Sequence, residues 1–358
     1  MGVIGAGSWT VASHLPTLAG WRDRGAVELS IVNRRDPEPL ARIQAQFGFR
    51  MATTDWHEVI AAEPDIVLVA TPPSLHAEQT RQALLAGAHV LCEKPFTLDP
   101  QDAWDLAAIA ERTARTLVIA YGWNYRPMAV EAHRLGHEPG ALGDIEHVSM
   151  HMDSFTRELL SGSGGYAMAA AGYPPRSETW TQAEVSGGGY GQAQLTHLLG
   201  LGLWLTGLRG EAVFALMKAA PGASVELHDA FTVRFRNGAI GTVSGASGHR
   251  GAAGHRQAVA IRVVGSRGML HVDLRENLLW RYERNGREVR VSLPPDAGSY
   301  DCRGPVDAVV AAALRRSVPN RSPADLGART VEILDAAYRS ARSGRLEPMR
   351  SPGASIDT

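Results

Sequence analysis

In the first 120 residues, apolar positions form short continuous runs separated by segments with helical spacing. Runs of consecutive Val, Ile and Leu are typical of strands buried on both faces of a parallel sheet. Strands that alternate with helices indicate βαβ units with right-handed crossovers. Strands are predicted over residues 3–4, 27–32, 66–70, 89–92 and 117–120, and the clearest helices over 74–86 and 100–112.

After residue 120 the pattern changes, because single apolar residues now alternate with polar ones. Phe231, Val233 and Phe235 alternate before the pair Asn237-Gly238, and a second Asn-Gly pair follows at 285–286. Asn-Gly between alternating runs is the strongest short-range signal of a β-hairpin. One-sided alternation predicts an antiparallel sheet with one face on helices and one freer face. Helices are predicted over 190–206, 305–316 and 324–340.

These patterns predict an α/β protein with two domains. Residues 1–120 would form a Rossmann domain with a doubly wound parallel sheet, and residues 121–345 an α+β substrate and oligomerisation domain with a mainly antiparallel open sheet. The alternating Leu278, Trp280 and Tyr282 fall on the freer face. An exposed apolar sheet face usually has a partner, so we expect a homodimer or homotetramer through this sheet.

Charge and composition restrict the functional classes. The 358 residues contain 36 Lys and Arg against 37 Asp and Glu, a balance that argues against nucleic-acid or membrane-surface binding. No apolar run approaches the roughly 20 residues of a membrane span. Met1 is followed by neither a basic segment nor a cleavage site, and Cys92 and Cys302 cannot form a disulfide framework. We therefore expect a cytoplasmic protein.

Two glycines lie between the first predicted strand and a helix. In the pattern G-x-G-x-x-G, a tight turn lets the backbone approach a pyrophosphate and points a helix N-terminus at it. Here Gly5 and Gly7 match, while Thr10 holds the third position. The placement in a βαβ unit predicts that Gly5, Gly7, Ser8 and Trp9 bind a dinucleotide, although a plain strand–helix turn would give the same pattern.

The end of the second predicted strand carries cations. NAD enzymes usually place an acidic residue here, whereas this chain has Asn33, Arg34 and Arg35. Arginine can clamp a 2′-phosphate bidentately, so the sequence favours NADP(H). NAD(H) is the alternative, with both arginines stacked on the adenine or facing water. Asp36 would take the acidic role only if the strand ended later.

Two more strand ends carry candidate cofactor contacts. Thr71-Pro72-Pro73 and His76 follow one apolar strand, and Glu93 and Lys94 follow the next. Ligands of such sheets bind at the carboxyl ends of the strands. Lys94 is placed there to hydrogen-bond a reacting oxygen, although a lysine at that position could equally be a surface charge.

The chain resembles the Gfo/Idh/MocA family of nicotinamide-dependent oxidoreductases over nearly its whole length. The resemblance implies hydride transfer between nicotinamide C4 and a hydroxyl-bearing carbon of a sugar, polyol or related carbonyl compound. The matching residues are Gly5-Ala6-Gly7, Ala70-Thr71-Pro72-Pro73 with His76, Ala86-Gly87-Ala88-His89-Val90, Glu93-Lys94-Pro95, and Gly187-Gly188-Gly189 with His197.

The resemblance also implies a catalytic pair, Lys94 and His197. In the family, a run of three glycines precedes a helix with Asp and, four residues later, His; here the Asp position is Ala193. We expect Lys94 to supply a cationic hydrogen bond and His197, with an ordinary pKa near 6.5, to exchange the proton. Gln194 would orient the substrate. A buried helix histidine is the alternative for His197, and the glycines would let backbone lie against a bound ring.

Other candidate substrate contacts are less specific. In the family, the stretch matching Asn124, Tyr125 and Arg126 often faces the substrate, but an interdomain hinge fits equally. Trp180 could stack on a sugar face or anchor its loop. No set of His, Cys and carboxylate residues has the spacing of a zinc site, so no metal is expected.

The leading prediction is an oxidoreductase that uses NADP(H), or NAD(H), on a sugar, cyclitol or related hydroxy or keto compound. One alternative is an enzyme that cleaves glycosides through transient oxidation by a tightly held NAD. The other is a non-catalytic nucleotide-binding module, which the missing Asp would permit.

Overall fold

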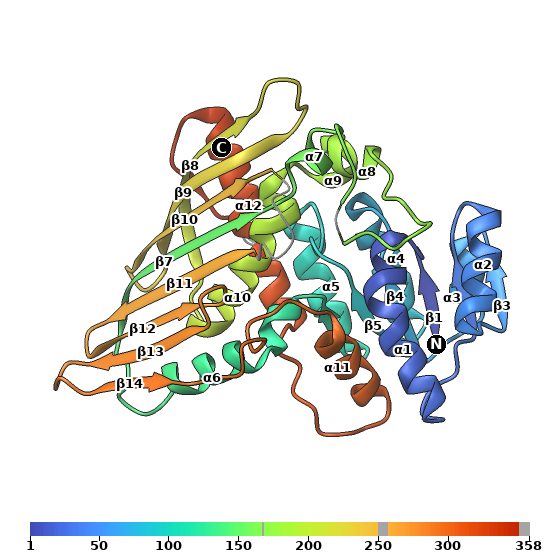
Figure 1. Cartoon of the computed structure of the whole chain (residues 1–358), viewed down its shortest axis with the longest axis horizontal. Helices are drawn as coiled ribbons and strands as arrows, with labels where there is room; N and C mark the ends of the chain where they lie inside the picture. The colour runs from blue at the N-terminus through green and yellow to red at the C-terminus, as the bar shows by residue number, and fades with distance from the viewer. Residues whose placement is uncertain (167, 250–256, 351–358) are drawn as a thin grey trace.

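The computed structural model describes residues 1–166, 168–249 and 257–350. Two sheets lie on opposite sides of a layer of helices, with the first sheet near the N-terminus and the second formed later in the chain (Figure 1). The predicted fold class, a Rossmann sheet followed by a mostly antiparallel open sheet, is confirmed. The predicted boundary between residues 120 and 121 stays a prediction.

The first sheet has six parallel strands in the order β3-β2-β1-β4-β5-β6. All five predicted strands are present, but β2 is shorter than residues 27–32, because β1 offers only three residues for it to pair with. The sequence patterns missed β3, a short edge strand. The strands are β1 (Gly2–Ile4), β2 (Ile31–Asn33), β3 (Met51–Thr53), β4 (Ile66–Val69), β5 (His89–Cys92) and β6 (Leu117–Ile119).

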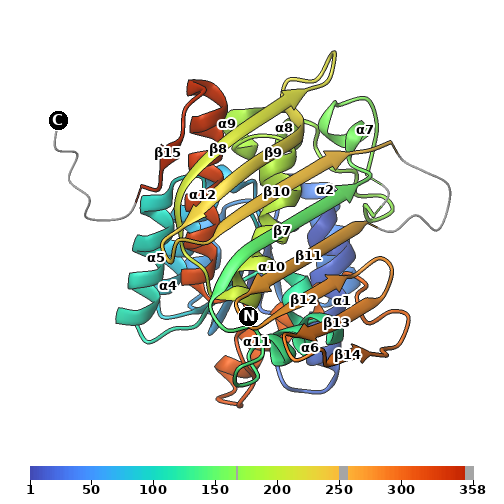
Figure 2. The same ribbon diagram turned by 90° about the vertical axis from the view of Figure 1, so that its left-hand side faces the viewer.

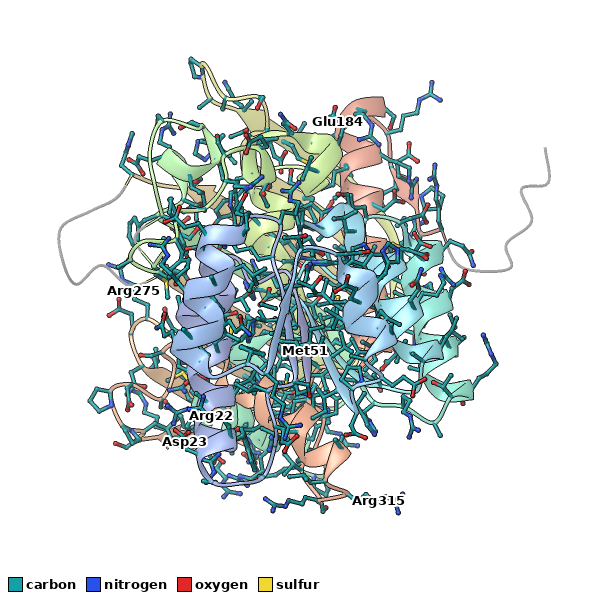
Figure 3. The ribbon with its side chains drawn as sticks, turned by 90° about the vertical axis from the view of Figure 1, so that its right-hand side faces the viewer. Arg22, Asp23, Met51, Glu184, Arg275 and Arg315 are labelled. Atoms are coloured by element: carbon teal, nitrogen blue, oxygen red, sulfur yellow. The ribbon has the colours of Figure 1, made fainter. Side chains whose placement is uncertain are left out.

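Helices cover both faces of this sheet. One of them, α11, comes from late in the chain and returns to the first sheet, where Val306, Val309 and Val310 join its apolar core. The helices of this part are α1 (Leu15–Asp23), α2 (Pro37–Phe47), α3 (Trp56–Ala61), α4 (His76–Leu85), α5 (Pro100–Arg112) and α11 (Arg303–Ala313). Figure 3 views this part from the side away from the second sheet, with Met51 on β3 and Arg22 and Asp23 at the end of α1.

The second sheet has nine strands in the order β14-β13-β12-β11-β7-β10-β9-β8-β15. Its pairs are antiparallel except β7 with β10, and both predicted Asn-Gly hairpins form. The strands are β7 (Ile145–Ser154), β8 (Gly210–Ala219), β9 (Glu226–Phe235), β10 (Ile240–Ser247), β11 (Ala258–Gly265), β12 (Gly268–Asp273), β13 (Leu278–Glu283), β14 (Glu288–Val291) and β15 (Glu347–Pro348).

The inner face of the second sheet packs on helices, and Figure 2 shows its outer face toward the viewer without a described helix over it. The helices of this half are α6 (Pro127–Gly136), α7 (Arg157–Leu160), α8 (Glu178–Thr181), α9 (Ala183–Ser186), α10 (Thr196–Thr206) and α12 (Ala324–Ser343). Every helix among the described residues is too short or too polar to cross a bilayer.

Candidate functional site

A cavity of about 280 Å³ lies at the carboxyl ends of the first sheet, against the start of α10. This is where ligands bind in doubly wound sheets. It brings together most of the predicted site residues. Those that line it are Gly5, Gly7, Ser8, Trp9, Asn33, Arg34, Arg35, Thr71, Pro72, Pro73, Glu93, Lys94, Trp180, Gln194 and His197.

The glycine turn has the shape that a dinucleotide needs. Gly5 has a φ of +87°, and an added Cβ would lie 2.6 Å from the backbone N of Thr71, so only glycine fits. An added Cβ on Gly7 would meet no described atom within 4 Å, which leaves an open cradle on the cavity wall. Thr10 at the third position is buried, and its hydroxyl donates to the Gly5 carbonyl at 2.9 Å. The turn therefore fits a pyrophosphate.

The end of β2 presents two cations and one anion to the cavity. Arg34 donates from Nη1 to the Ala6 carbonyl at 2.7 Å, and its Nη2 lies 3.3 Å from Oδ2 of Asp36. Arg35 is exposed beside them. Because β2 ends at Asn33, Asp36 is the N-cap residue of α2 and not the acidic residue at the strand tip.

Glu93 is a buried carboxylate beneath the cavity. It accepts hydrogen bonds from Nε1 of Trp9 and from the backbone N of Lys94, both at 3.0 Å, and it lies 2.6 Å from Nε2 of His14. Burial alone would raise its pKa, but the hydrogen bond and charge of His14 and the charge of Lys94 hold that pKa below its ordinary value. Glu93 therefore stays ionised and fixes Trp9 and Lys94 in place.

Lys94 reaches across the cavity to the other half of the molecule. Its Nζ donates to the carbonyl of Ala193 at 2.8 Å, so a backbone group holds the ammonium at the position where the resemblance implies an Asp. Burial lowers the pKa of Lys94, and the Glu93 carboxylate opposes part of that shift. Lys94 thus lies in the crevice and not at the surface.

His197 lies among three aromatic rings on the first turn of α10. The ring centroids of Tyr121, Trp123 and Tyr300 lie 6.5, 5.3 and 5.2 Å from it, all edge-on. Burial and the charge of Lys94 lower the pKa of His197 well below its ordinary value. With a pKa lowered in this way, the imidazole is neutral at neutral pH. The predicted role of His197 in proton exchange stays a prediction. The ring Nδ1 has no hydrogen-bond partner among the described residues.

The glycines before α10 meet a packing requirement within the protein, and Gly188 also lines the cavity. That they let backbone lie against a bound ring stays a prediction. An added Cβ on Gly188 would overlap the Tyr338 hydroxyl, and one on Gly189 would overlap the Glu226 carbonyl. The chain then enters a π-helical turn, η4 (Gly191–Leu195), before α10 begins. Such turns occur often at functional sites.

Three predicted substrate residues are not brought to the cavity. The side chains of Asn124 and Tyr125 bond to the segment 320–322, with Asn124 Nδ2 donating to a carbonyl there at 3.0 Å. Arg126 pairs with Asp301. Their polar groups are used to join distant parts of the chain, so the hinge interpretation of this stretch fits and the substrate interpretation does not.

His76 also lies outside the cavity lining, although it was predicted to contact the cofactor. It is fully buried, and its two ring nitrogens each lie 2.8 Å from a carbonyl oxygen, those of Thr71 and Pro95. The ring therefore braces the two loops that do line the cavity.

Several cavity residues have no local sequence signal. Tyr300 and Arg176 come from loops that only the tertiary fold brings to the site.

The side chains of His14, Glu93 and Cys302 have ligand-type atoms within 4.8 Å of one another. Because the positive charge of Lys94 acts on Glu93 and would repel a further cation, we assign no metal to this group.

Comparisons with known proteins agree with this architecture. The family model described as "Oxidoreductase family, NAD-binding Rossmann fold" matches residues 1–121, and the model "GFO/IDH/MocA C-terminal domain" matches residues 137–271. Levoglucosan dehydrogenase of Pseudarthrobacter phenanthrenivorans is 25% identical over 327 residues, which cover 83% of this chain and 76% of that protein. D-glucoside 3-dehydrogenase of Escherichia coli is 36% identical over 89 residues, 24% of each chain.

Solved structures match over nearly the whole chain. A crystal structure of GenD2 from gentamicin A biosynthesis in complex with NAD is 26% identical, with a TM-score of 0.76 over 98% of this chain and 96% of that one. Levoglucosan dehydrogenase in complex with NADH and levoglucosan has a TM-score of 0.76 at 22% identity, over 98% of this chain and 99% of that one, and supports the fold. Because family models match both halves of the chain, it belongs to the Gfo/Idh/MocA family and is an NAD(P)-dependent oxidoreductase.

Proposed function

We propose that this protein transfers a hydride between NADP(H) and the CH–OH carbon of a sugar, cyclitol or related hydroxy or keto compound. The observation that carries the proposal is the hydrogen bond from Lys94 Nζ to the Ala193 carbonyl. It fixes a proton-exchanging group in the same cavity as the glycine turn. The names of the two dehydrogenase relatives support a sugar substrate.

Oxidation of an alcohol removes a hydride from carbon and a proton from the hydroxyl. The hydride would pass to the nicotinamide of a dinucleotide held at the glycine turn and the end of β2, the redox chemistry that this cofactor would supply. Lys94 is the best proton acceptor of this cavity, because a lowered pKa raises the fraction of neutral amine near pH 7. In the reverse direction, the ammonium returns the proton to the carbonyl oxygen.

His197 then acts as a neutral partner of the substrate. Its low pKa makes it a poor proton store but lets it exchange hydrogen bonds with a hydroxyl without adding a second positive charge beside Lys94. Gln194 and Trp180 line the same cavity and could orient the remaining hydroxyls and cover an apolar ring face.

The preference for NADP(H) rests on Arg34 and Arg35, which line the cavity at the end of β2. Guanidiniums bind a phosphate by charge-assisted, bidentate hydrogen bonds. NAD(H) is the second candidate because Asp36 lines the same wall and could accept ribose hydroxyls.

The test is a titration of protein fluorescence with NADPH and NADH, followed by a screen of polyols and ketosugars with the tighter cofactor. Net turnover of added NADPH with a ketone supports the proposal. Tightly retained NAD with glycoside cleavage would replace it with the transient-oxidation mechanism. Nucleotide binding without turnover, unchanged by Lys94→Ala, would identify a non-catalytic module.

We also propose that the outer face of the second sheet joins copies of the chain into a homodimer or homotetramer. Leu278, Trp280 and Tyr282 lie on this face, as predicted, and Leu216 and Ile240 there are 68% and 58% exposed. Exposed apolar surface of this kind usually marks an interface.

A further inference from the structure

The C-terminal domain supplies a cation to the wall of the cavity where β2 ends. Arg176 lines this wall beside residues 33–36, and its guanidinium pairs with Oδ1 of Asp36. The other carboxylate oxygen, Oδ2, lies 3.3 Å from Nη2 of Arg34. Asp36 is therefore held between two guanidiniums, one from each half of the molecule.

Two further contacts hold the segment 170–176 against the first domain. The backbone N of Ala170 donates to Oγ of Ser8 at 3.0 Å, next to the glycine turn. The ring centroid of Tyr173 lies 5.9 Å from Cζ of Arg34, within the range of a cation–π contact. In Figure 1 this green segment follows α7 and extends over the first sheet. The position of Arg176 is thus set by a run of contacts, not by one ion pair.

The charges at this wall decide which cofactor fits. The hydrogen bond from Arg176 lowers the pKa of Asp36, so the carboxylate is ionised at neutral pH. Without the neighbouring guanidiniums, the Asp36 carboxylate would attract ribose hydroxyls and repel a 2′-phosphate. Arg34, Arg35 and Arg176 line the cavity with this single carboxylate and leave a surplus of two positive charges. Without Arg176 the surplus falls to one, and Asp36 keeps only Arg34 as a partner.

We propose that Arg176 is a specificity-determining residue of the cofactor site, which neutralises Asp36 and supplies, with Arg34, a cation for the 2′-phosphate of NADP(H). This inference rests on the proposed function, because it requires a dinucleotide in the cavity. It adds Arg176, from the C-terminal domain, to the residues at the tip of β2 that select the cofactor.

Calorimetric titrations with NADPH, NADH, 2′,5′-ADP and 5′-ADP test the proposal. Arg176→Ala is expected to weaken binding of the two 2′-phosphate ligands about tenfold or more, since charge-assisted pairs to phosphate are of this strength. NADH and 5′-ADP should change by less than about twofold. Arg176→Lys should recover part of the loss. The matched control is Arg345→Ala, which removes one positive charge from an exposed site outside the cavity lining.

Asp36→Asn provides a second measurement that leaves Arg176 in place. It should strengthen NADPH binding and weaken NADH binding, because both guanidiniums are released and the acceptor of ribose hydroxyls loses its charge. The proposal is overturned if Arg176→Ala weakens all four ligands equally or none of them, or if Asp36→Asn leaves the NADPH-to-NADH ratio unchanged. Absence of dinucleotide binding by the wild-type protein would instead refute the proposed function.

Discussion

Lysine occurs at two positions of this chain, 94 and 218, so 34 of its 36 basic residues are arginines. Lys218 is exposed on β8, whereas Lys94 lines the cavity and bonds to Ala193. An amine can give up its proton near neutral pH when it is buried, but a guanidinium cannot. At the residue scale, the use of lysine at position 94 is therefore consistent with proton exchange and not only with positive charge.

Removal of this amine should stop proton transfer. Lys94→Met keeps much of the side-chain volume and is expected to lower kcat about 10²-fold or more. Affinity for the cofactor should change far less, which equilibrium fluorescence titration measures beside steady-state rates. Lys218→Met is the matched control and should keep wild-type turnover. Wild-type rates in Lys94→Met would exclude Lys94 from the reaction.

The small number of lysines also allows the Lys94 pKa to be measured directly. In protein labelled with ¹³Cε-lysine, Lys218→Arg leaves one side-chain signal, that of Lys94. Because burial lowers its pKa, this signal should titrate below the ordinary value of 10.5. The oxidation rate should rise with pH through the same midpoint, since the neutral amine is the acceptor. A midpoint at or above 10.5 would contradict this account.

At the element scale, the π-helical turn η4 (Gly191–Leu195) presents a backbone group to Lys94. The Ala193 carbonyl accepts the ammonium, and Glu226 holds the turn by accepting from the backbone N of Gly189 and of Gly191 at 2.8 and 3.1 Å. A carbonyl is a neutral partner, so it orients Lys94 without raising its pKa as a carboxylate would. Where the resemblance implies an Asp, Ala193 thus leaves no carboxylate side chain on this turn, which affects the charge beside Lys94 and not only the shape of the site.

Restoration of that carboxylate should therefore shift the pH profile. Ala193→Asp places a negative charge beside the ammonium and is expected to raise the Lys94 pKa, because an opposite charge favours the charged form. The rising limb of the oxidation rate moves to higher pH, and the rate at pH 7 falls accordingly. Ala193→Asn has nearly the same shape without the charge and should leave the midpoint in place. Equal profiles for both variants would show that charge at position 193 does not act on Lys94.

Elements with local signals were predictable from the sequence, and those defined by pairing were not. The predicted helix over 100–112 forms with these bounds because Asp99 caps it and Pro100 begins it. Strand β8 (Gly210–Ala219) was missed because its apolar run resembles a helix, and only pairing with β9 makes it a strand. In the site, the strand-end residues were found, whereas Tyr300 and Arg176 depend on loops placed by tertiary packing.

At the scale of the whole molecule, the outer face of the nine-stranded sheet has a consequence for assembly, because no described helix covers it. Ile240 on β10 and Leu216 on β8 point away from the helices. Charged residues at these positions should be tolerated by the fold, because the side chains are solvated in the single chain. They would be costly inside an interface, where an unpaired charge loses its water.

The double variant Leu216→Asp/Ile240→Asp is therefore expected to reduce the mass in solution to that of one chain, as measured by sedimentation equilibrium. Met51→Asp is the control, because Met51 is 54% exposed on the opposite side of the molecule (Figure 3). It should leave the mass unchanged. A wild-type protein that is already a single chain at micromolar concentration would refute assembly through this face.

Helix α11 (Arg303–Ala313) makes the folding of the first sheet depend on a late part of the chain. Its valines complete the apolar core of the first sheet, and the hydroxyl of Ser322, just beyond it, donates to the Ile119 carbonyl at 2.6 Å on the edge strand. A fragment cut after residue 121 would leave that core open to water and should aggregate. Hybrids that exchange the nucleotide-binding half between relatives must consequently transplant two stretches of gene, with the region encoding residues 303–323 carried along.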